Sequence, residues 1–367
     1  MNKRTTRAAV LLAVLLCISM TLTGCTSAES IRDNGKPSIV CTAFPQYDWT
    51  LQILGDRADD FNVILLNHQG TDMHSFQPTA ENMVNMANCD LFIHIGGFSE
   101  GWVPAALESA GNHHAQVLTL LEHVDAKAEE FTEGMEHNHD HDHDHGHGHE
   151  SEADEHEAEV DMHEEDEHDS EAGNHDEDGH GHEEDAHVEE LDEHLWLSLR
   201  CAQDACEAIT EAICQLDPAH AADYQANADA YSQQLHELDH EYEHAVQEAG
   251  TNVLLFADRF PFRYLTDDYG IEYLAAFPGC SAETEASFET ILYLSEEMDA
   301  HHLTCAIVLE GSKEDFAKTV ISNTKADDPK ILTLNSMQSV NQRHIDAGVT
   351  YLGIMKENLT VLKEALR

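Results

Sequence analysis

Eight short runs of apolar residues, rich in Val, Ile, Leu and Phe, recur along the chain in two groups of four. Stretches suited to helices lie between them. Runs that are apolar at nearly every position are typical of strands covered on both faces, and alternation with helices is typical of parallel sheets. The sequence therefore predicts two α/β lobes of about a hundred residues each. The first group comprises residues 38–44, 61–66, 90–97 and 115–120, and the second comprises 251–258, 271–277, 305–310 and 331–334.

A single long helix is predicted between the two groups, over residues 217–249. Asp217 suits its capping position and Pro218 suits its first turn. Apolar or aromatic residues then follow at spacings of 7, 4, 3, 4 and 4, which form one stripe on a helix of roughly 30 residues. Gly250 ends the pattern. A rigid rod between two lobes would limit hinge motion. The stripe consists of Tyr224, Tyr231, Leu235, Leu238, Tyr242 and Val246.

The first 25 residues indicate export and a lipid anchor. Three basic residues precede an apolar run from Ala8 to Met20, which is too short to span a bilayer as a stable helix. The sequence L-T-G-C follows, ends at Cys25 and resembles a bacterial lipobox, which implies cleavage before Cys25 and lipid on its sulfur. An ordinary signal peptide is the alternative. Residues 1–24 are thus predicted to be a signal peptide, and residues 25–36 a polar leash.

A tract dominated by His, Asp and Glu occupies residues 131–190. Fourteen of the 28 histidines lie between His137 and His187, and residues 128–199 hold 30 acidic residues and no Lys or Arg. Such a segment has too little apolar surface to offset its ordering entropy, so disorder is predicted. Neutral imidazole binds zinc, copper and nickel, and carboxylates add oxygen donors. The tract therefore favours a weak, multi-site metal collector, with an acidic tether as the alternative.

Charge and cysteine content restrict the partners further. Without residues 1–24 the chain has 15 basic and 72 acidic residues, a net charge of −57, which argues against a nucleic-acid partner. Seven cysteines follow Cys25, and none forms a C-x-x-C motif. An odd number cannot all pair within one chain, and the sequence cannot assign a disulfide. Buried thiols that act as small apolar residues are an equally good interpretation.

Two groups of residues could carry the chemistry. Residues 97–101 match the G-x-S-x-G motif of serine hydrolases, with Ser99 as the nucleophile. Only two predicted strands precede the strand that leads into this motif in the mature chain, which leaves little room for a hydrolase sheet. The second group consists of His74, which follows a strand and a turn, and His194, which opens a helix directly after the tract. Each lies at the end of an element, where α/β lobes form ligand sites.

These stretches resemble the zinc/manganese-binding lipoproteins of bacterial ABC importers, the zinc-uptake solute-binding family. Residues 70–79 are similar to its G-x-D-P-H-x-Y-x-P stretch, which implies that His74 is the first metal ligand. Residues 94–102 resemble its G-x-x-x-E-x-W stretch, which accounts for the serine motif. From His194 the chain is similar to H-x-W-L-D-P and a later D-P-containing stretch, which implies that His194 is the second ligand. The similarity runs from about residue 38 to the C-terminus.

The second lobe departs from the family pattern. Where the family has a third ligand in H-D-A-x-G-Y, this chain reads D-R-F-P-F-R-Y, with Arg259 on the ligand position, and a late Asp is replaced by Asn335. A guanidinium cannot ligate a metal, and an amide oxygen is a weak donor to zinc. Water could complete the shell. Alternatively, Asp258 and Glu310 could ligate from strand ends, with Arg259 anchoring a carboxylate, and Cys280 is a further soft candidate.

The predicted architecture is two doubly wound α/β lobes joined by one long rigid helix, with a metal site in the cleft between the lobes. The predicted ligands are His74, His194, Asp258 and Glu310. The N-terminal lobe comprises residues 37–130 and 191–216, and the C-terminal lobe comprises residues 250–367.

The family resemblance implies a monomeric receptor that is not an enzyme. It would capture Zn²⁺ outside the cell and deliver it to an ABC permease and its ATPase, while the lipid on Cys25 holds it at the membrane. Imidazole donors and the tract favour Zn²⁺ over Mn²⁺, which prefers more oxygen ligands. The alternatives are an envelope zinc buffer without a transport partner and a serine hydrolase that uses Ser99.

Overall fold

The computed structural model describes residues 34–135, 190–281 and 286–367. The predicted signal peptide, the lipidation site Cys25 and almost all of the predicted tract lie outside these ranges, so the predictions made for them are not tested. Within these ranges, no helix has both the length and the apolar character needed to cross a bilayer.

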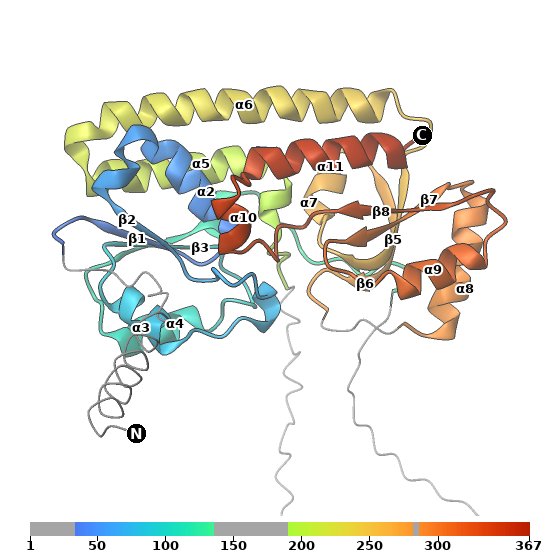
Figure 1. Ribbon diagram of the computed structural model, residues 1–367, viewed down its shortest axis with the longest axis horizontal. Helices are drawn as coiled ribbons and strands as arrows, with labels where there is room; N and C mark the ends of the chain where they lie inside the picture. The colour runs from blue at the N-terminus through green and yellow to red at the C-terminus, as the bar shows by residue number, and fades with distance from the viewer. Residues whose placement is uncertain (1–33, 136–189, 282–285) are drawn as a thin grey trace, which may run out of the picture. The chain divides into compact units, whose positions relative to one another are not determined.

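Two four-stranded parallel sheets form the framework (Figure 1). The strand orders are β2-β1-β3-β4 and β6-β5-β7-β8, so each sheet starts near its middle and reverses direction, as doubly wound sheets do. Every predicted apolar run overlaps one strand, and the predicted fold class is confirmed. The strands are β1 (Ser38–Cys41), β2 (Asn62–Leu65), β3 (Leu91–His94), β4 (Gln116–Thr119), β5 (Val253–Phe260), β6 (Glu272–Pro278), β7 (Cys305–Leu309) and β8 (Lys330–Leu334).

The first sheet is buried on both faces. Side chains alternate along a strand, so Ile39 and Cys41 join one apolar cluster while Val40 joins another. Trp49 and Ala205 lie in the first of these clusters and come from α2 (Phe44–Leu54) and α5 (Leu199–Leu216). The other face packs against α3 (Ala80–Ala87) and α4 (Val103–Ala110). Because helices cover both faces, the two central strands β1 and β3 are buried at every position and lack a polar alternation in sequence.

The second sheet follows the same rule. Leu254 and Phe256 of β5 join the cluster that runs through the first lobe, whereas Val253 and Leu255 join a separate cluster with α8 (Phe288–Ala300) and α9 (Asp315–Ser322). The shared cluster also contains residues of α7 (Arg263–Tyr269) and α11 (Tyr351–Ala365). A short helix, α10 (Gln342–Asp346), precedes α11. One apolar core therefore joins both sheets.

The predicted connecting helix is α6 (Ala221–Gln247), with 27 residues. Residues 218–220 form a 3-10 turn ahead of it, and Asp217 accepts hydrogen bonds from the Tyr224 hydroxyl at 2.7 Å and the His220 ring at 2.7 Å. The helix packs against α2 and α5 of the first lobe and against α7 and α11 of the second lobe (Figure 1). Since α6 contacts helices of both lobes, it braces them along its length.

All seven described cysteines are free thiols. Burial raises the pKa of Cys41 to about 12, so this thiol behaves as a small apolar group. Cys214 and Cys280 are the two partly exposed members of the set. The fully buried ones are Cys41, Cys89, Cys201, Cys206 and Cys305.

Candidate metal centre

The two predicted histidines share one local motif, D-x-H. Asp72 lies two residues before His74, and Asp192 lies two residues before His194. In each case the aspartate Oδ1 accepts the backbone N–H of the histidine, at 3.0 Å for His74 and 2.8 Å for His194. A 3-10 turn forms beside each histidine, at Met73–Ser75 and Leu195–Leu197. These Asx-type turns fix the backbone from which each imidazole projects.

The two imidazoles meet at their Nε2 atoms, which are 3.3 Å apart. His194 is fully buried and His74 is partly buried. Zinc bonds imidazole nitrogen at 2.0–2.1 Å, and a tetrahedral angle between two such bonds places the nitrogens about 3.3 Å apart. The pair therefore has the spacing that two ligands of one zinc ion require.

The other nitrogen of each imidazole has a hydrogen-bond partner. His194 Nδ1 lies 2.9 Å from Asp192 Oδ1, and His74 Nδ1 lies 2.5 Å from Ser99 Oγ. An ionised carboxylate only accepts, so His194 carries its proton on Nδ1 and a lone pair on Nε2. The Ser99 hydroxyl can accept from His74 Nδ1 in the same way. Such partners are typical of histidines that bind a metal through the opposite nitrogen.

Electrostatics keep His74 in the form that binds metal. Burial lowers the pKa of His74 to about 4, and the neighbouring His194 imidazole acts in the same direction. His74 is consequently neutral at pH 7. Neutral imidazole is the metal-binding form, so no proton has to leave this ring before coordination.

A third ligand atom lies beside the pair. The Sγ of Cys280 and one nitrogen from each of the two histidines all lie within 4.8 Å of one another. In the described part of the chain this is the one group of three or more His, Cys, Asp or Glu side chains with metal-binding spacing. Cys280 follows β6 in a turn, so the second lobe contributes one member of this candidate group.

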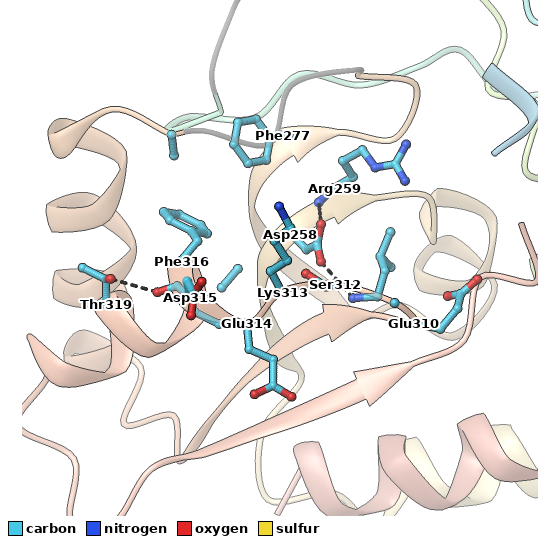
Figure 2. Close-up of a pocket in the computed structure, with 15 residues that line it drawn as sticks. Asp258, Arg259, Phe277, Glu310, Ser312, Lys313, Glu314, Asp315, Phe316 and Thr319 are labelled. Carbon is cyan, nitrogen blue, oxygen red and sulfur yellow. Dashed lines mark hydrogen bonds between the residues drawn. The ribbon is translucent and has the colours of Figure 1, made fainter. Parts of the chain in front are cut away.

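Asp258, one of the two acids predicted from the second lobe, lies elsewhere. It lines a hollow of about 750 Å³ near the carboxyl ends of β5 and β7 (Figure 2). Its carboxylate accepts the backbone N–H of Arg259 at 2.9 Å and of Leu309 at 3.0 Å. Asp258 thus connects β5 to β7, and it is not part of the group formed by His74, His194 and Cys280.

Glu310 lines the same hollow and is also engaged locally (Figure 2). Its carboxylate accepts the Ser336 backbone N–H at 2.7 Å and hydroxyl at 2.9 Å, and the Ser339 hydroxyl at 3.2 Å. These bonds tie the end of β7 to the loop after β8. The structure therefore unites the two predicted histidines but does not bring either predicted acid to them.

Arg259 connects the second lobe to the turn that carries His74. Its Nη2 donates to Asp72 Oδ2 at 2.7 Å, and its Nη1 donates to the Ser281 carbonyl at 3.4 Å. Although burial opposes it, the Arg259 guanidinium holds the pKa of Asp72 below its ordinary value. The carboxylate that Arg259 anchors is thus Asp72, in the opposite lobe.

Ser99 is arranged as a partner of His74 rather than as a nucleophile. A hydrolytic triad needs an acid on the second nitrogen of its histidine base, but that nitrogen of His74 faces His194. The backbone N–H of Ser99 donates to Glu193 at 2.5 Å, which fixes the loop.

Several supporting residues escaped the sequence-based prediction. The repeated D-x-H spacing could have predicted that Asp72 and Asp192 support the two histidines. Glu129, whose Oε1 accepts the Cys280 backbone N–H at 3.1 Å, gave no local pattern. Ala128, the residue before Glu129, pairs with Leu191 in an antiparallel bridge. This bridge places Glu129 near His194, although the two are far apart in sequence.

The fold consists of two parallel α/β lobes braced by one helix. Two imidazoles from one lobe converge with a thiol from the other. This combination is that of a solute-binding receptor for a metal ion. Residues 39–365 match the family model described as ZnuA, zinc-uptake complex component A, periplasmic. The chain belongs to this family, as the sequence motifs predicted. Members are substrate-binding receptors for metal transport, so the prediction that the chain is not an enzyme is confirmed.

Curated relatives cover nearly the whole chain. It is 28% identical to the high-affinity zinc uptake system protein ZnuA of Bacillus subtilis over 359 residues, which are 98% of this chain and 95% of that protein. It is 26% identical to the zinc-binding lipoprotein AdcA of Streptococcus pneumoniae over 354 residues, or 96% of this chain. The chain spans only 60% of the length of AdcA.

Solved structures share the fold. The metal-dependent lipoprotein YcdH from Bacillus subtilis superimposes with a TM-score of 0.64 at 24% identity, covering 90% of this chain and 99% of that one. The Zn(II)-bound ZnuA-like domain of Streptococcus pneumoniae AdcA gives 0.63 at 22% identity, with the same coverage. A manganese-bound periplasmic metal-binding protein from Candidatus Liberibacter asiaticus gives 0.64 at 19% identity, covering 90% of this chain and all of that one.

Proposed function

We propose that this chain is an extracytoplasmic, lipid-anchored receptor that captures Zn²⁺ and delivers it to an ABC permease and its ATPase. The observation that carries the proposal is the His74–His194 pair, with its Nε2 atoms 3.3 Å apart and each Nδ1 held by a partner. A preorganised site binds more tightly because less ordering is needed on association. Family membership and the zinc-uptake role named for the Bacillus subtilis relative support the transport part.

Zinc is the proposed cargo rather than manganese. Imidazole suits zinc, whereas manganese prefers carboxylate, carbonyl and water oxygens. Asp258 and Glu310 would supply such oxygens, but neither belongs to the group formed by His74, His194 and Cys280, and each already accepts backbone N–H groups. Their role as ligands stays a prediction. It would gain support if Asp258→Ala or Glu310→Ala lowered zinc affinity without changing the melting temperature.

The remaining parts of the proposal concern the residues outside the described ranges. Residues 1–24 would be removed, lipid on Cys25 would anchor a monomer through the leash of residues 25–36, and the tract of residues 131–190 would collect zinc for the cleft. The relative AdcA is itself called a zinc-binding lipoprotein. Cys25→Ala should therefore shift the protein from the membrane fraction to the soluble fraction.

Crystallography with anomalous scattering at the zinc edge tests the site directly. One zinc ion should refine within bonding distance of both Nε2 atoms, at about 2.0–2.1 Å. A tightly bound zinc ion elsewhere, with neither imidazole in its shell, would contradict the proposed site.

Uptake experiments separate the receptor from a zinc buffer. Under zinc limitation, deletion of this gene and deletion of the cognate permease should reduce cellular zinc accumulation to a similar extent. The combined deletion should add little, because both proteins act in one route. If gene deletion lowers only the zinc held in the envelope, the protein is a buffer and the transport part of the proposal is wrong.

A further inference from the structure

We infer that Cys280 supplies a third, thiolate ligand at this site, so that Zn²⁺ is held by two imidazole nitrogens and one sulfur. The inference rests on the proposed function, since it concerns the same site. Its Sγ and the two histidine nitrogens already lie within 4.8 Å of one another. Tetrahedral zinc, with Zn–S of 2.3 Å and Zn–N of 2.0–2.1 Å, needs S···N separations of about 3.5 Å. A movement of roughly an ångström in the turn would close the shell.

The turn that carries Cys280 packs directly on the imidazole pair. A Cβ on Gly279 would lie 3.2 Å from His194 Cε1 and 2.8 Å from the Phe260 carbonyl oxygen. The absence of a side chain at position 279 therefore allows the backbone to approach His194. Close approach of backbone to a ligand site is a common reason for glycine in such a turn.

Two contacts from opposite lobes hold this turn in place. Glu129 accepts the Cys280 backbone N–H at 3.1 Å, and Arg259 donates to the Ser281 carbonyl at 3.4 Å. The same Arg259 side chain also binds Asp72, which caps the turn of His74. One guanidinium thus connects the turn that carries the thiol to the turn that carries an imidazole. These polar contacts of Arg259 position the turns that carry Cys280 and His74.

The surroundings of Cys280 differ from those of the other thiols. Burial raises the pKa of the Cys280 thiol, and the carboxylates of Glu129, Asp192, Glu193 and Glu190 act in the same direction, so the thiol keeps its proton until a cation binds. A divalent cation is attracted to such a set. When zinc binds, the S–H bond breaks, the Zn–S bond forms and the proton leaves to solvent. Since sulfur is a soft donor, a thiolate at this position favours Zn²⁺ over Mn²⁺.

Cys214 provides the matched control. It is the other partly exposed thiol, and its Sγ lies 3.6 Å from the Ala221 carbonyl oxygen at the start of α6. It belongs to no metal-binding group among the described side chains. A cysteine replacement that affects folding or redox behaviour in general should therefore appear in Cys214→Ser as well as in Cys280→Ser.

Cobalt substitution in the full-length protein tests the inference. Thiolate coordination to Co²⁺ gives an intense charge-transfer band in the near ultraviolet, to which the imidazoles and carboxylates of the tract do not contribute. The first equivalent of Co²⁺ should produce this band in the wild type and in Cys214→Ser but not in Cys280→Ser. Added Zn²⁺ should abolish it. Cys280→Ser should also lower zinc affinity at least tenfold while leaving manganese affinity within about twofold.

The possible outcomes are distinct. If the band persists in Cys280→Ser, or is absent from a wild type that binds zinc through His74 and His194, the thiolate inference is wrong and the proposed receptor stands. If the wild type binds no metal tightly, the proposed function fails as well. Circular dichroism checks the folding of each variant. In the wild type, zinc should protect Cys280 but not Cys214 from alkylation, as mapped by mass spectrometry, and equal alkylation of both would overturn the inference.

Discussion

At the scale of single residues, the candidate site depends on groups other than the proposed ligands. His74 and His194 were predictable because each follows a recognisable motif at an element end. That the two Nε2 atoms face each other was not predictable, since this depends on Ser99 and Asp192 holding the Nδ1 atoms. Of these, only Asp192 is near its histidine in sequence. A short-range pattern can reveal a capping aspartate, but it cannot reveal a serine 25 residues away.

Replacement of either histidine tests the ligand pair. His74→Ala or His194→Ala should weaken zinc binding at least tenfold, equivalent to about 1.4 kcal/mol, because each removes one metal–nitrogen bond. Competition with a chromophoric chelator at pH 7 measures the affinity. His113→Ala, which changes an exposed histidine, should leave the affinity unaltered. Wild-type affinity in both site variants would rule these ligands out.

The Asp192 carboxylate tests the role of the supporting groups. Asp192→Asn keeps the side-chain size and an acceptor oxygen for the His194 backbone N–H, but it removes the negative charge that orients the imidazole. Zinc affinity should fall about 10–100-fold, as is usual when such a partner is lost. Ser99→Ala should cost less, because a hydroxyl is a weaker acceptor than a carboxylate. An Asn variant with unchanged zinc affinity would mean that His194 is oriented by packing alone.

At the scale of elements, strands were easier to predict than the second lobe's contribution to the site. Parallel strands covered on both faces must be apolar at nearly every position, so all eight were visible in the sequence. A carboxylate at a strand end, however, has two possible uses. It can face a ligand, or it can accept backbone N–H groups of its neighbours, as Asp258 and Glu310 do. The apolar pattern of a strand carries no information on that choice.

The guanidinium that links the two lobes gives a prediction about interlobe contacts. Arg259→Ala should lower zinc affinity several-fold, because Asp72 loses its partner and the turns of His74 and Ser281 lose a common anchor. Arg263→Ala is the matched control, since its side chain pairs with Asp267 and Glu130 instead. Calorimetry on both variants measures the difference. Equal affinities would show that the Arg259–Asp72 pair does not position the site.

A buried carboxylate between α2 and α11 gives a pH prediction. Burial raises the pKa of Asp48 to about 6, while the Tyr351 backbone N–H that it accepts at 3.1 Å acts in the opposite direction. The unfolded value is about 3.9. The folded state therefore binds the proton more tightly, so this group's stabilising contribution is complete below pH 3.9 and is lost as pH rises through 6.

Asp48→Asn removes this titration while keeping a possible acceptor for Tyr351. From pH 4.5 to 7.5, the unfolding free energy of the wild type should fall relative to that of the variant by about 1–3 kcal/mol, at about 1.4 kcal/mol per pKa unit. Guanidinium unfolding of both proteins at the two pH values gives the difference. A gap that does not change with pH would mean that Asp48 stays ionised in the folded protein.

At the scale of the whole molecule, one core restricts what the lobes can do. A single apolar cluster extends from the first sheet through α6 to the second sheet. Separating the lobes widely would expose that cluster to water, which opposes a large hinge opening. Metal entry and release should instead involve local movement of the turns that carry His74 and Cys280. The sequence predicted the rigid helix, but not that both sheets share the core beneath it.

The described residues on either side of the histidine-rich tract lie next to each other. Beside the Ala128–Leu191 bridge, the Glu129 backbone N–H donates to the Glu190 carbonyl at 2.8 Å, and the Asp192 N–H donates to the Lys127 carbonyl at 2.8 Å. The bridge brings residues next to both ends of the tract together and leads directly into the D-x-H turn of His194. Sites in the tract would raise the local zinc concentration beside the cleft.

Replacing residues 137–187 with a Gly/Ser linker of about ten residues should separate collection from capture. Total zinc stoichiometry should fall, while one tight site and the melting temperature remain. On acidification the wild type should release the zinc of the tract first, near pH 5.5, because ordinary imidazoles have a pKa of about 6.5 whereas burial holds the pKa of His74 at about 4. Growth should suffer only when zinc is scarce. If the shortened protein loses its tight site, the tract supplies ligands to the cleft, and the division between collector and carrier is wrong.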